Sequence, residues 1–286
     1  ETNPYSLSNR FVYPIVKDRE GGIWIGTFYG GVNYLSPNTG QFECFAHSRF
    51  SNSVNGTVIG RFCEDTYGHI WIASDDGGLS CFSPKDKHFT HYLPDEHGNS
   101  LSYHNVHALC MDGDDLWIGT YTGGVNVLNT KTGVFRVYTT KAGDPTTLDR
   151  SSSYAIFKDR EARIWVTSMS GVNLYNREED NFTRIRDLGS WIMDIDQDAD
   201  GNIWFSSQGN GLFKYNPDKQ EWTNYVHSSA PGALINDQVN CVLIDGNGEM
   251  WIGTMNGLCK YNAKEDHFEL IPLDIPSSNI CAIIED

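Results

Sequence analysis

The most informative stretch of the chain is residues 65–74, Asp-Thr-Tyr-Gly-His-Ile-Trp-Ile-Ala-Ser. Versions of this stretch occur six times in the sequence, and this repetition predicts the fold. The tryptophans of the six copies are separated by 47, 46, 48, 39 and 47 residues. A fixed spacing of about 40–50 residues is typical of proteins built from stacked structural repeats. The six repeat tryptophans are Trp24, Trp71, Trp117, Trp165, Trp204 and Trp251.

Each repeat contains four short stretches of alternating apolar and polar residues, bounded by glycine, proline, aspartate or asparagine. This pattern indicates four antiparallel strands, here named A to D, joined by hairpins. Such a sheet must bury both faces and protect both edges, which stacking around an axis achieves. The sequence therefore predicts an all-β fold, a single β-propeller domain of six four-stranded blades plus the first strand of a seventh. The predicted blades are residues 9–46, 57–93, 105–139, 153–186, 191–226 and 238–272, and the seventh begins at 279–286.

The residues of the repeat itself are predicted to be structural. The tryptophan in strand B is expected to pack between neighbouring blades, and the aspartate before it to cap the A–B turn through backbone amides. Two positions after each tryptophan stands a small residue, which is expected to leave room for a ring of the next blade. These small residues are Gly26, Ala73, Gly119, Thr167, Ser206 and Gly253.

Residues 18–32 and 245–258 follow the pattern D-x-x-G-x-[IL]-W-[IV]-G-T-x-x-G-[GL]-[LV] closely, and all six copies can be recognised. At these residues the chain resembles the two-component regulator propeller repeat. The resemblance implies the periplasmic sensor region of a hybrid two-component histidine kinase, often a glycan sensor, with a propeller that usually has seven blades. It also implies a fragment, because residues 280–286 look like strand A and the turn aspartate of a seventh repeat.

The charge balance argues against two classes of partner. The chain has 37 acidic and 21 basic side chains, a formal charge of −16. This charge repels phosphate backbones and anionic lipid surfaces, so we expect neither nucleic-acid binding nor direct membrane contact. No apolar run reaches the roughly 20 residues of a membrane span.

No cofactor or metal site is expected. The seven cysteines form no C-x-x-C pair and read as small buried residues, and the nine histidines form no H-E-x-x-H motif. His104 and His107 approach the predicted channel without a metal-binding pattern. Residues 196–201 imitate the start of a calcium loop, but the twelfth position is Ser207 instead of an acid.

One end of the blades varies freely in sequence while the other is repetitive. The A–B turns recur in every repeat, whereas the tips of the B–C turns and the D–A linkers differ completely, including Arg49 and His97. Variable loops on a rigid scaffold commonly carry binding functions. We therefore expect ligand contacts at this end, with these candidates besides Trp191: Phe28, Tyr29, Asp75, Asp76, Tyr121, His104, Gln208, Asn210 and Asn256.

The 39-residue interval marks a shortened D–A linker at residues 186–190. A missing loop is expected to leave a notch in the rim, and Trp191 follows it directly at the start of strand A. An indole beside a notch offers a rigid face for stacking on a sugar. The alternative is a core ring that fills a narrowed blade, and both interpretations stay open here.

The sequence favours a non-catalytic sensor that detects an oligosaccharide or other small ligand and signals to a C-terminal kinase. The alternative is a protein-interaction platform, including homodimerisation. A propeller lyase or glycosidase is a third reading. A sialidase-type site needs a cluster of arginines, and only Arg10, Arg61 and Arg150 fall near the predicted inner face.

Overall fold

The computed structural model describes residues 6–48, 52–96, 98–274 and 278–285, so Arg49, His97 and Asp286 lie outside the described residues. The described chain contains 24 strands in six antiparallel sheets, and each sheet consists of four strands consecutive in sequence. No helix occurs among these residues. The predicted all-β fold of six four-stranded blades is confirmed.

The strand bounds follow the predicted repeats. Blades 1 to 3 comprise β1 (Val12–Lys17), β2 (Ile23–Thr27), β3 (Gly31–Leu35), β4 (Phe42–Phe45); β5 (Ile59–Glu64), β6 (Ile70–Ser74), β7 (Gly78–Ser83), β8 (His88–Tyr92); β9 (Val106–Asp112), β10 (Asp115–Thr120), β11 (Val125–Asn129), β12 (Phe135–Tyr138). Blades 4 to 6 comprise β13 (Ile156–Lys158), β14 (Ile164–Thr167), β15 (Gly171–Asn176), β16 (Asn181–Asp187); β17 (Ile192–Gln197), β18 (Ile203–Ser207), β19 (Leu212–Asn216), β20 (Glu221–Tyr225); β21 (Val239–Ile244), β22 (Met250–Thr254), β23 (Gly257–Asn262), β24 (His267–Ile271).

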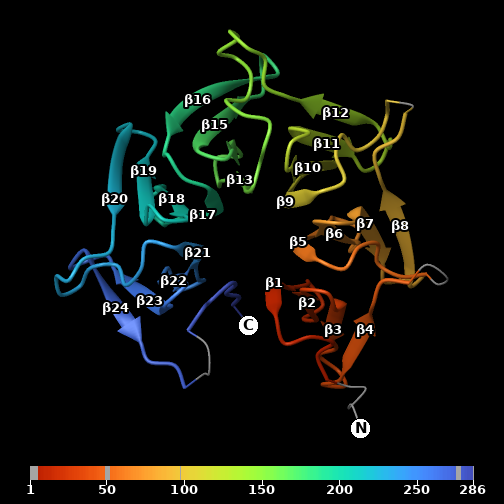
Figure 1. The fold of residues 1–286 in the computed structure, drawn as a ribbon, viewed down its shortest axis with the longest axis horizontal. Helices are drawn as coiled ribbons and strands as arrows, with labels where there is room; N and C mark the ends of the chain where they lie inside the picture. Colours follow the sequence, from red (N-terminus) through yellow and green to blue (C-terminus); the bar gives the residue numbers. More distant parts are fainter. Residues whose placement is uncertain (1–5, 49–51, 97, 275–277, 286) are drawn as a thin grey trace. The chain divides into compact units, whose positions relative to one another are not determined.

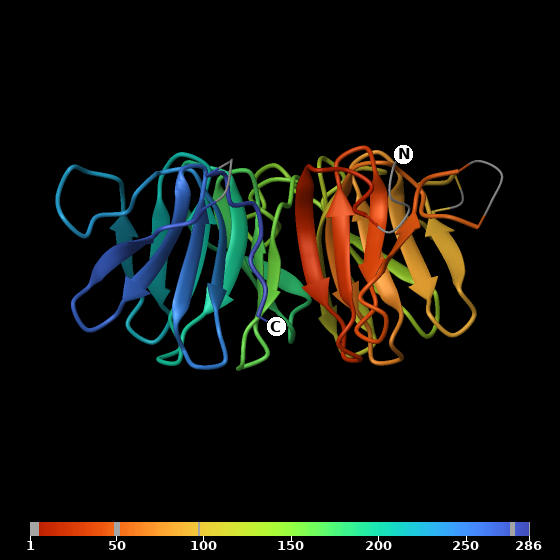
Figure 2. The same cartoon turned by 90° about the horizontal axis from the view of Figure 1, so that it is seen from below.

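The blades divide between two compact units. The strands of blades 1 to 3 belong to the first unit and those of blades 4 to 6 to the second. Within each unit the first strands of successive blades lie side by side, as β1, β5 and β9 do in Figure 1, while the fourth strands diverge. Because β1 points downward in Figure 2, the A–B turn of blade 1 lies at the lower end of its unit and the B–C turn at the upper end. We call these the turn end and the loop end.

The turn aspartates do more than cap a turn. The Asp18 Oδ1 atom accepts hydrogen bonds from the amides of Glu20 and Gly22, as predicted, and Oδ2 accepts one from the indole N–H of Trp24 at 2.8 Å. The same indole bond to the aspartate six residues earlier recurs at 2.7–3.1 Å in four further repeats. The repeated aspartate thus fixes the turn and the orientation of the tryptophan together.

The tryptophans pack between blades within each unit. Trp24 of blade 1, for example, lies in one core cluster with Ile59, Phe62 and Phe82 of blade 2. The small residues after the tryptophan are explained differently from the prediction. A Cβ on Gly26 would come within 2.5 Å of Pro14 on the first strand of the same blade and 2.6 Å of Ile59 on the first strand of the next, so first strands and not an aromatic ring take the space.

The predicted seventh-blade strand is not part of a sheet among the described residues, and Asp286 lies outside them. Residues 278–285 nevertheless lie against blade 6. The amide of Ile280 donates to the Thr254 carbonyl, and a Cβ on Gly253 would meet Ile280 as one on Gly26 would meet Ile59. The Glu285 carboxylate accepts from the amide of Gly246 at 2.9 Å. This segment therefore makes the contacts of a strand A without pairing to a strand B.

The D–A linkers only partly follow the prediction that they form the loop end. The Asn99 side chain accepts a hydrogen bond from the Phe135 amide and donates one to the Gly133 carbonyl, at the start of the outer strand of the next blade. Asn52 makes the equivalent bonds at the start of β8. The middle of these linkers satisfies polar groups near an exposed sheet edge, where unpaired strands are a liability.

The same linkers are anchored by one buried aliphatic side chain each. These are Val54, Leu101, Leu148 and Leu234, all at most 1% exposed.

The cysteines fit the predicted buried role only in part. All seven are free thiols, and Cys241 and Cys259 are buried, but Cys44 on the outer strand β4 is exposed.

Candidate functional site

An aromatic pair covers the loop end of blade 1. Phe28 and Tyr29 form the tip of the B–C turn, with their rings edge to face at a centroid distance of 4.5 Å. Tyr29 is 71% exposed and has a φ of 65°, a backbone conformation uncommon for a large side chain. Its amide donates to the Thr57 carbonyl at 2.9 Å, and the amide of Phe28 donates to the backbone carbonyl of Phe11, whose side chain is also exposed. The turn therefore holds two aromatic side chains outward.

An acid, an imidazole and a phenol meet at the loop end of blades 2 and 3. The Asp75 Oδ1 atom lies 3.2 Å from Nδ1 of His107, and the His107 ring meets Tyr121 edge to face at 6.0 Å. The side chains of Asp75 and His107 are 37% and 19% exposed. This group offers hydrogen-bond donors and acceptors beside an aromatic face, a combination suited to a hydroxylated ligand.

Asp76 and His104 differ in their contacts: Asp76 forms several hydrogen bonds within the protein, whereas the His104 ring is exposed. Both Asp76 oxygens accept hydrogen bonds, from the Thr57 hydroxyl at 2.7 Å, the Ser74 hydroxyl at 2.7 Å and the amides of Thr57 and Val58. Burial opposes ionisation of Asp76, but these hydrogen bonds outweigh it and lower the pKa of the carboxyl. His104 is exposed and stacks on Tyr103 at 4.7 Å. The structure thus assigns Asp76 to holding the linker and leaves His104 accessible.

Trp191 is exposed and held in place. Its ring is 44% exposed and stacks on Tyr154 with a centroid distance of 5.3 Å and an interplanar angle of 14°. Tyr154 is buried, so one face of the indole is fixed to the scaffold. The expectation of a core ring is therefore wrong for Trp191, and its exposure is consistent with the stacking hypothesis, which stays a prediction.

The polar candidates of the second unit tie loops together around Trp191. The amide of Gln208 donates to the Trp191 carbonyl, and its side-chain amide donates to Asn240 at 2.9 Å. The Asn210 side chain donates to the Leu188 carbonyl at 3.0 Å. The Asn256 side chain is exposed on the B–C turn of blade 6.

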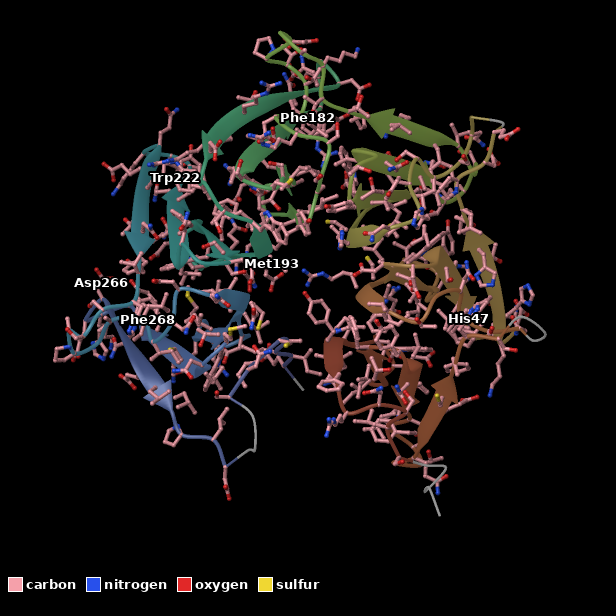
Figure 3. All side chains as sticks on the ribbon, in the orientation of Figure 1. His47, Phe182, Met193, Trp222, Asp266 and Phe268 are labelled. Atoms are coloured by element: carbon pink, nitrogen blue, oxygen red, sulfur yellow. The ribbon has the colours of Figure 1, made fainter. Side chains whose placement is uncertain are left out.

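The short linker of the 39-residue interval is confirmed, since β16 ends at Asp187 and β17 begins at Ile192. Leu188 is buried in a core cluster with Ile192 and Ile195, so the linker is packed down onto the sheet. Figure 3 labels Met193 on β17 and Trp222 on β20, the inner and outer strands of this blade. A notch beside Trp191 stays a prediction.

Two residues that contact the candidates were not among them. His107 was considered only in setting aside a metal site, although it lies between Asp75 and Tyr121. Tyr154 was not considered at all. Its signal lies in the topology, because Tyr154 precedes strand A of blade 4 as Trp191 precedes strand A of blade 5, and β13 and β17 lie in contact.

The inner strand β17 also carries a partly buried carboxylate. Asp196 accepts hydrogen bonds from the amides of Ile244 at 2.6 Å and Gln197 at 2.8 Å. Burial raises the pKa of Asp196 to about 6, helped by the neighbouring Asp194 and opposed by those two bonds and Arg160. No group of histidine, cysteine and acidic side chains that could hold a metal ion is found among the described residues.

Family comparison supports the repeat assignment directly. The two component regulator propeller family matches residues 6–29, 100–122 and 233–256. The chain contains two-component regulator propeller repeats. Histidine kinase P4 of Formosa agariphila is 26% identical over 172 residues, which cover 55% of this chain and 12% of that kinase.

Solved structures confirm the propeller fold. The extracellular domain of BT3049 from B. thetaiotaomicron, described as a hybrid two component system, matches with a TM-score of 0.81 and 21% identity over 99% of this chain. Virginiamycin B lyase from Staphylococcus aureus matches with a TM-score of 0.72 and 14% identity over 94% of this chain and 87% of its own.

This chain spans only part of the length of these two larger relatives. This chain covers 12% of the matched kinase and 38% of the BT3049 domain. Within the part of the chain that the structure describes, no helix has the length and apolar character needed to cross a bilayer.

Proposed function

We propose that this chain is a non-catalytic ligand-sensing module of a hybrid two-component regulator, located on the periplasmic side of the inner membrane. The propeller repeats and the relatives described as two-component systems support the proposal. An oligosaccharide is the proposed ligand, bound at the loop end, and the signal passes to a C-terminal kinase.

The stacked pair of Trp191 and Tyr154 carries the oligosaccharide assignment. A sugar ring presents an apolar C–H face and hydroxyl edges, so it pairs with a flat aromatic ring bordered by hydrogen-bonding groups. Trp191 supplies such a face without first losing rotamer freedom, because Tyr154 already fixes one side. In the other unit, Tyr29, Tyr121 and the Asp75–His107 pair offer a similar mixture of rings and polar atoms.

Thermal shift and calorimetry against a panel of oligosaccharides test this function. At least one glycan is expected to raise the melting temperature, since a ligand that binds only the folded state stabilises it. Trp191→Ala should then weaken binding by about tenfold or more, whereas Trp191→Phe should retain most of it. Leu270→Ala, at an exposed outer-strand residue, is the control and should bind like wild type.

Two results would overturn the proposal. A panel that produces no shift, together with sugar-independent dimerisation in light scattering, would favour a protein-interaction platform. Turnover of a bound glycan, detected by chromatography, would show a lyase or glycosidase instead.

A further inference from the structure

A second hollow lies at the turn end of blades 1 and 2, away from the loop-end site. It is an open hollow with a volume of about 950 Å³, lined by the A–B and C–D turns of both blades. Its apolar wall includes Trp24, Phe45 and Phe82, and its blade 1 side carries the carboxylates of Glu20 and Glu43. This volume is within the range of roughly 300–1,000 Å³ that small-molecule sites occupy.

Three of the other repeats place a cation beside the repeat tryptophan, whereas blades 2 and 3 have Cys81 and Val127 opposite it on strand C. In blades 5 and 6 the residue directly opposite the tryptophan on strand C is a lysine. The Nζ atom of Lys214 lies 5.1 Å from the ring centroid of Trp204, and that of Lys260 lies 5.3 Å from Trp251. Both distances are typical of a cation–π contact.

Blade 4 reaches the same arrangement by another route. Its strand C residue is Leu174, and Arg163 from the A–B turn instead places its guanidinium 5.6 Å from Trp165. Arg163 is paired with the turn aspartate Asp159. Three repeats therefore supply a cation of their own to an aromatic ring at the turn end.

Blade 1 has an aromatic ring where blades 5 and 6 have lysine. Tyr34 stands opposite Trp24, with ring centroids 4.6 Å apart. Gly22 occupies the position of Arg163 in blade 4, and a Cβ there would come within 2.6 Å of the Tyr34 ring. Among the described residues no lysine or arginine makes a ring contact with Trp24 or Tyr34.

The hollow beside Tyr34 has a net negative lining, because five carboxylates outnumber two lysines: Asp18, Glu20, Glu43, Glu64 and Asp86 against Lys85 and Lys87. Burial raises the pKa of the Tyr34 phenol, and the carboxylates of Asp18, Glu20 and Glu43 raise it further. Asp18 is already bonded within its turn, and the Glu43–Lys87 pair is long, at 3.7 Å, and exposed. An exposed ion pair of this kind contributes little and is readily exchanged.

We propose that this hollow binds a small organic cation, an amine or a guanidinium, with its charged group over the Tyr34 ring between Glu20 and Glu43. The ligand takes the place that Arg163, Lys214 and Lys260 fill in their own repeats. The site is separate from the loop-end site, and each can fail without the other.

Calorimetry with cadaverine as the probe tests the site, with agmatine as the guanidinium arm and 1,5-pentanediol as the neutral match. Cadaverine should bind and pentanediol should not. Glu20→Gln combined with Glu43→Gln should weaken cadaverine binding by about tenfold or more, because it removes both flanking charges. The control is Glu178→Gln combined with Glu221→Gln, the same loss of charge on exposed residues outside the hollow.

Tyr34→Lys is the most specific variant, since Lys214 and Lys260 show that the repeat accepts lysine at this position. It supplies an internal cation and should abolish cadaverine binding while preserving the melting temperature within a few degrees. The proposal is wrong if cadaverine does not bind the wild type, if pentanediol binds equally well, or if the two double variants weaken binding alike. Wild-type affinity in a folded Tyr34→Lys variant would also overturn it.

Discussion

Asp65 at the turn end and Asp75 at the loop end both belong to blade 2, yet their surroundings differ. The Asp65 carboxylate is buried and accepts bonds from the amides of Tyr67 and His69 and from the indole of Trp71. Asp75 is partly exposed, next to His107 and the edge-on ring of Tyr121. At the turn end the carboxylate is taken up by the scaffold, whereas at the loop end Asp75 lies 3.2 Å from His107 and its side chain stays 37% exposed.

In this chain, side chains that recur in every blade differ in their use from side chains that vary between blades. Side chains that recur in every blade are consumed by the contacts that build the blade. Side chains that vary do not take part in these repeated contacts, although a single blade can use one locally, as blade 2 uses the exposed Asp76. In blade 1 the turn end has Tyr34 where blades 5 and 6 have a lysine over the tryptophan.

The largest effect is expected from Asp65→Ala. The substitution leaves the Trp71 indole N–H and two turn amides without their acceptor, which should cost about 3 kcal/mol of unfolding free energy. Urea denaturation measures the loss. Asp200→Ala, at an exposed turn residue, should change stability by less than about 0.5 kcal/mol. Equal effects of the two variants would contradict the distinction between the ends.

Asp196, on the inner strand β17, is expected to make the stability of the protein depend on pH. Its pKa of about 6 in the folded protein is above the unfolded value of 3.8, so the folded state binds the proton more tightly. Its contribution to stability is therefore complete below about pH 4 and is lost as the pH rises through about 6. Asp196→Asn should remove about 2 kcal/mol of this pH dependence.

Denaturation of Asp196→Asn and wild type between pH 4 and 7 measures that difference. Asp218→Asn, at an exposed residue of the same blade, should leave the pH profile unchanged. An Asp196→Asn profile parallel to that of the wild type would mean that Asp196 titrates normally.

Asp76→Ala sharpens the comparison at the loop end itself. It removes the acceptor for the Thr57 and Ser74 hydroxyls and should destabilise the protein by about 1 kcal/mol, less than Asp65→Ala because the site is more exposed. The amides of Thr57 and Val58 should exchange faster with solvent hydrogen in the variant, because in the wild type they donate hydrogen bonds to Asp76. Unchanged exchange there would show that the linker is held by other contacts.

The smallest effect on stability is expected from Tyr29→Ala, within about 0.5 kcal/mol, because the ring is largely exposed. Chemical denaturation checks this value. The same experiment on Tyr34→Ala, whose ring packs on Trp24, should give a clearly larger loss. If Tyr29→Ala is as destabilising as Tyr34→Ala, the B–C tip of blade 1 is scaffold and not an available surface.

Much of the architecture was predictable from sequence because it depends on local spacing. The period of the tryptophans gave six blades, and the Asp-x-x-Gly pattern gave the A–B turns. The indole bond from Trp24 to Asp18 follows from the same spacing but was not predicted, since it requires knowing that the two side chains lie on one face of the hairpin. The exposure of Trp191 could not be settled, because it depends on Tyr154 in the preceding blade.

The sequence by itself determined the fold class, the number of blades and the scaffold role of the repeated residues, because period and turn chemistry are local properties. The uses of the variable side chains became clear only from the tertiary structure. Asp76 and Asn210 form hydrogen bonds that hold linkers, while the side chains of Asp75, Tyr121 and Trp191 are partly exposed. The tertiary structure also shows that Tyr34, at the strand position where blades 5 and 6 have a lysine, lines a hollow. These outcomes depend on contacts between blades, which residues distant in sequence make only after the sheets have packed.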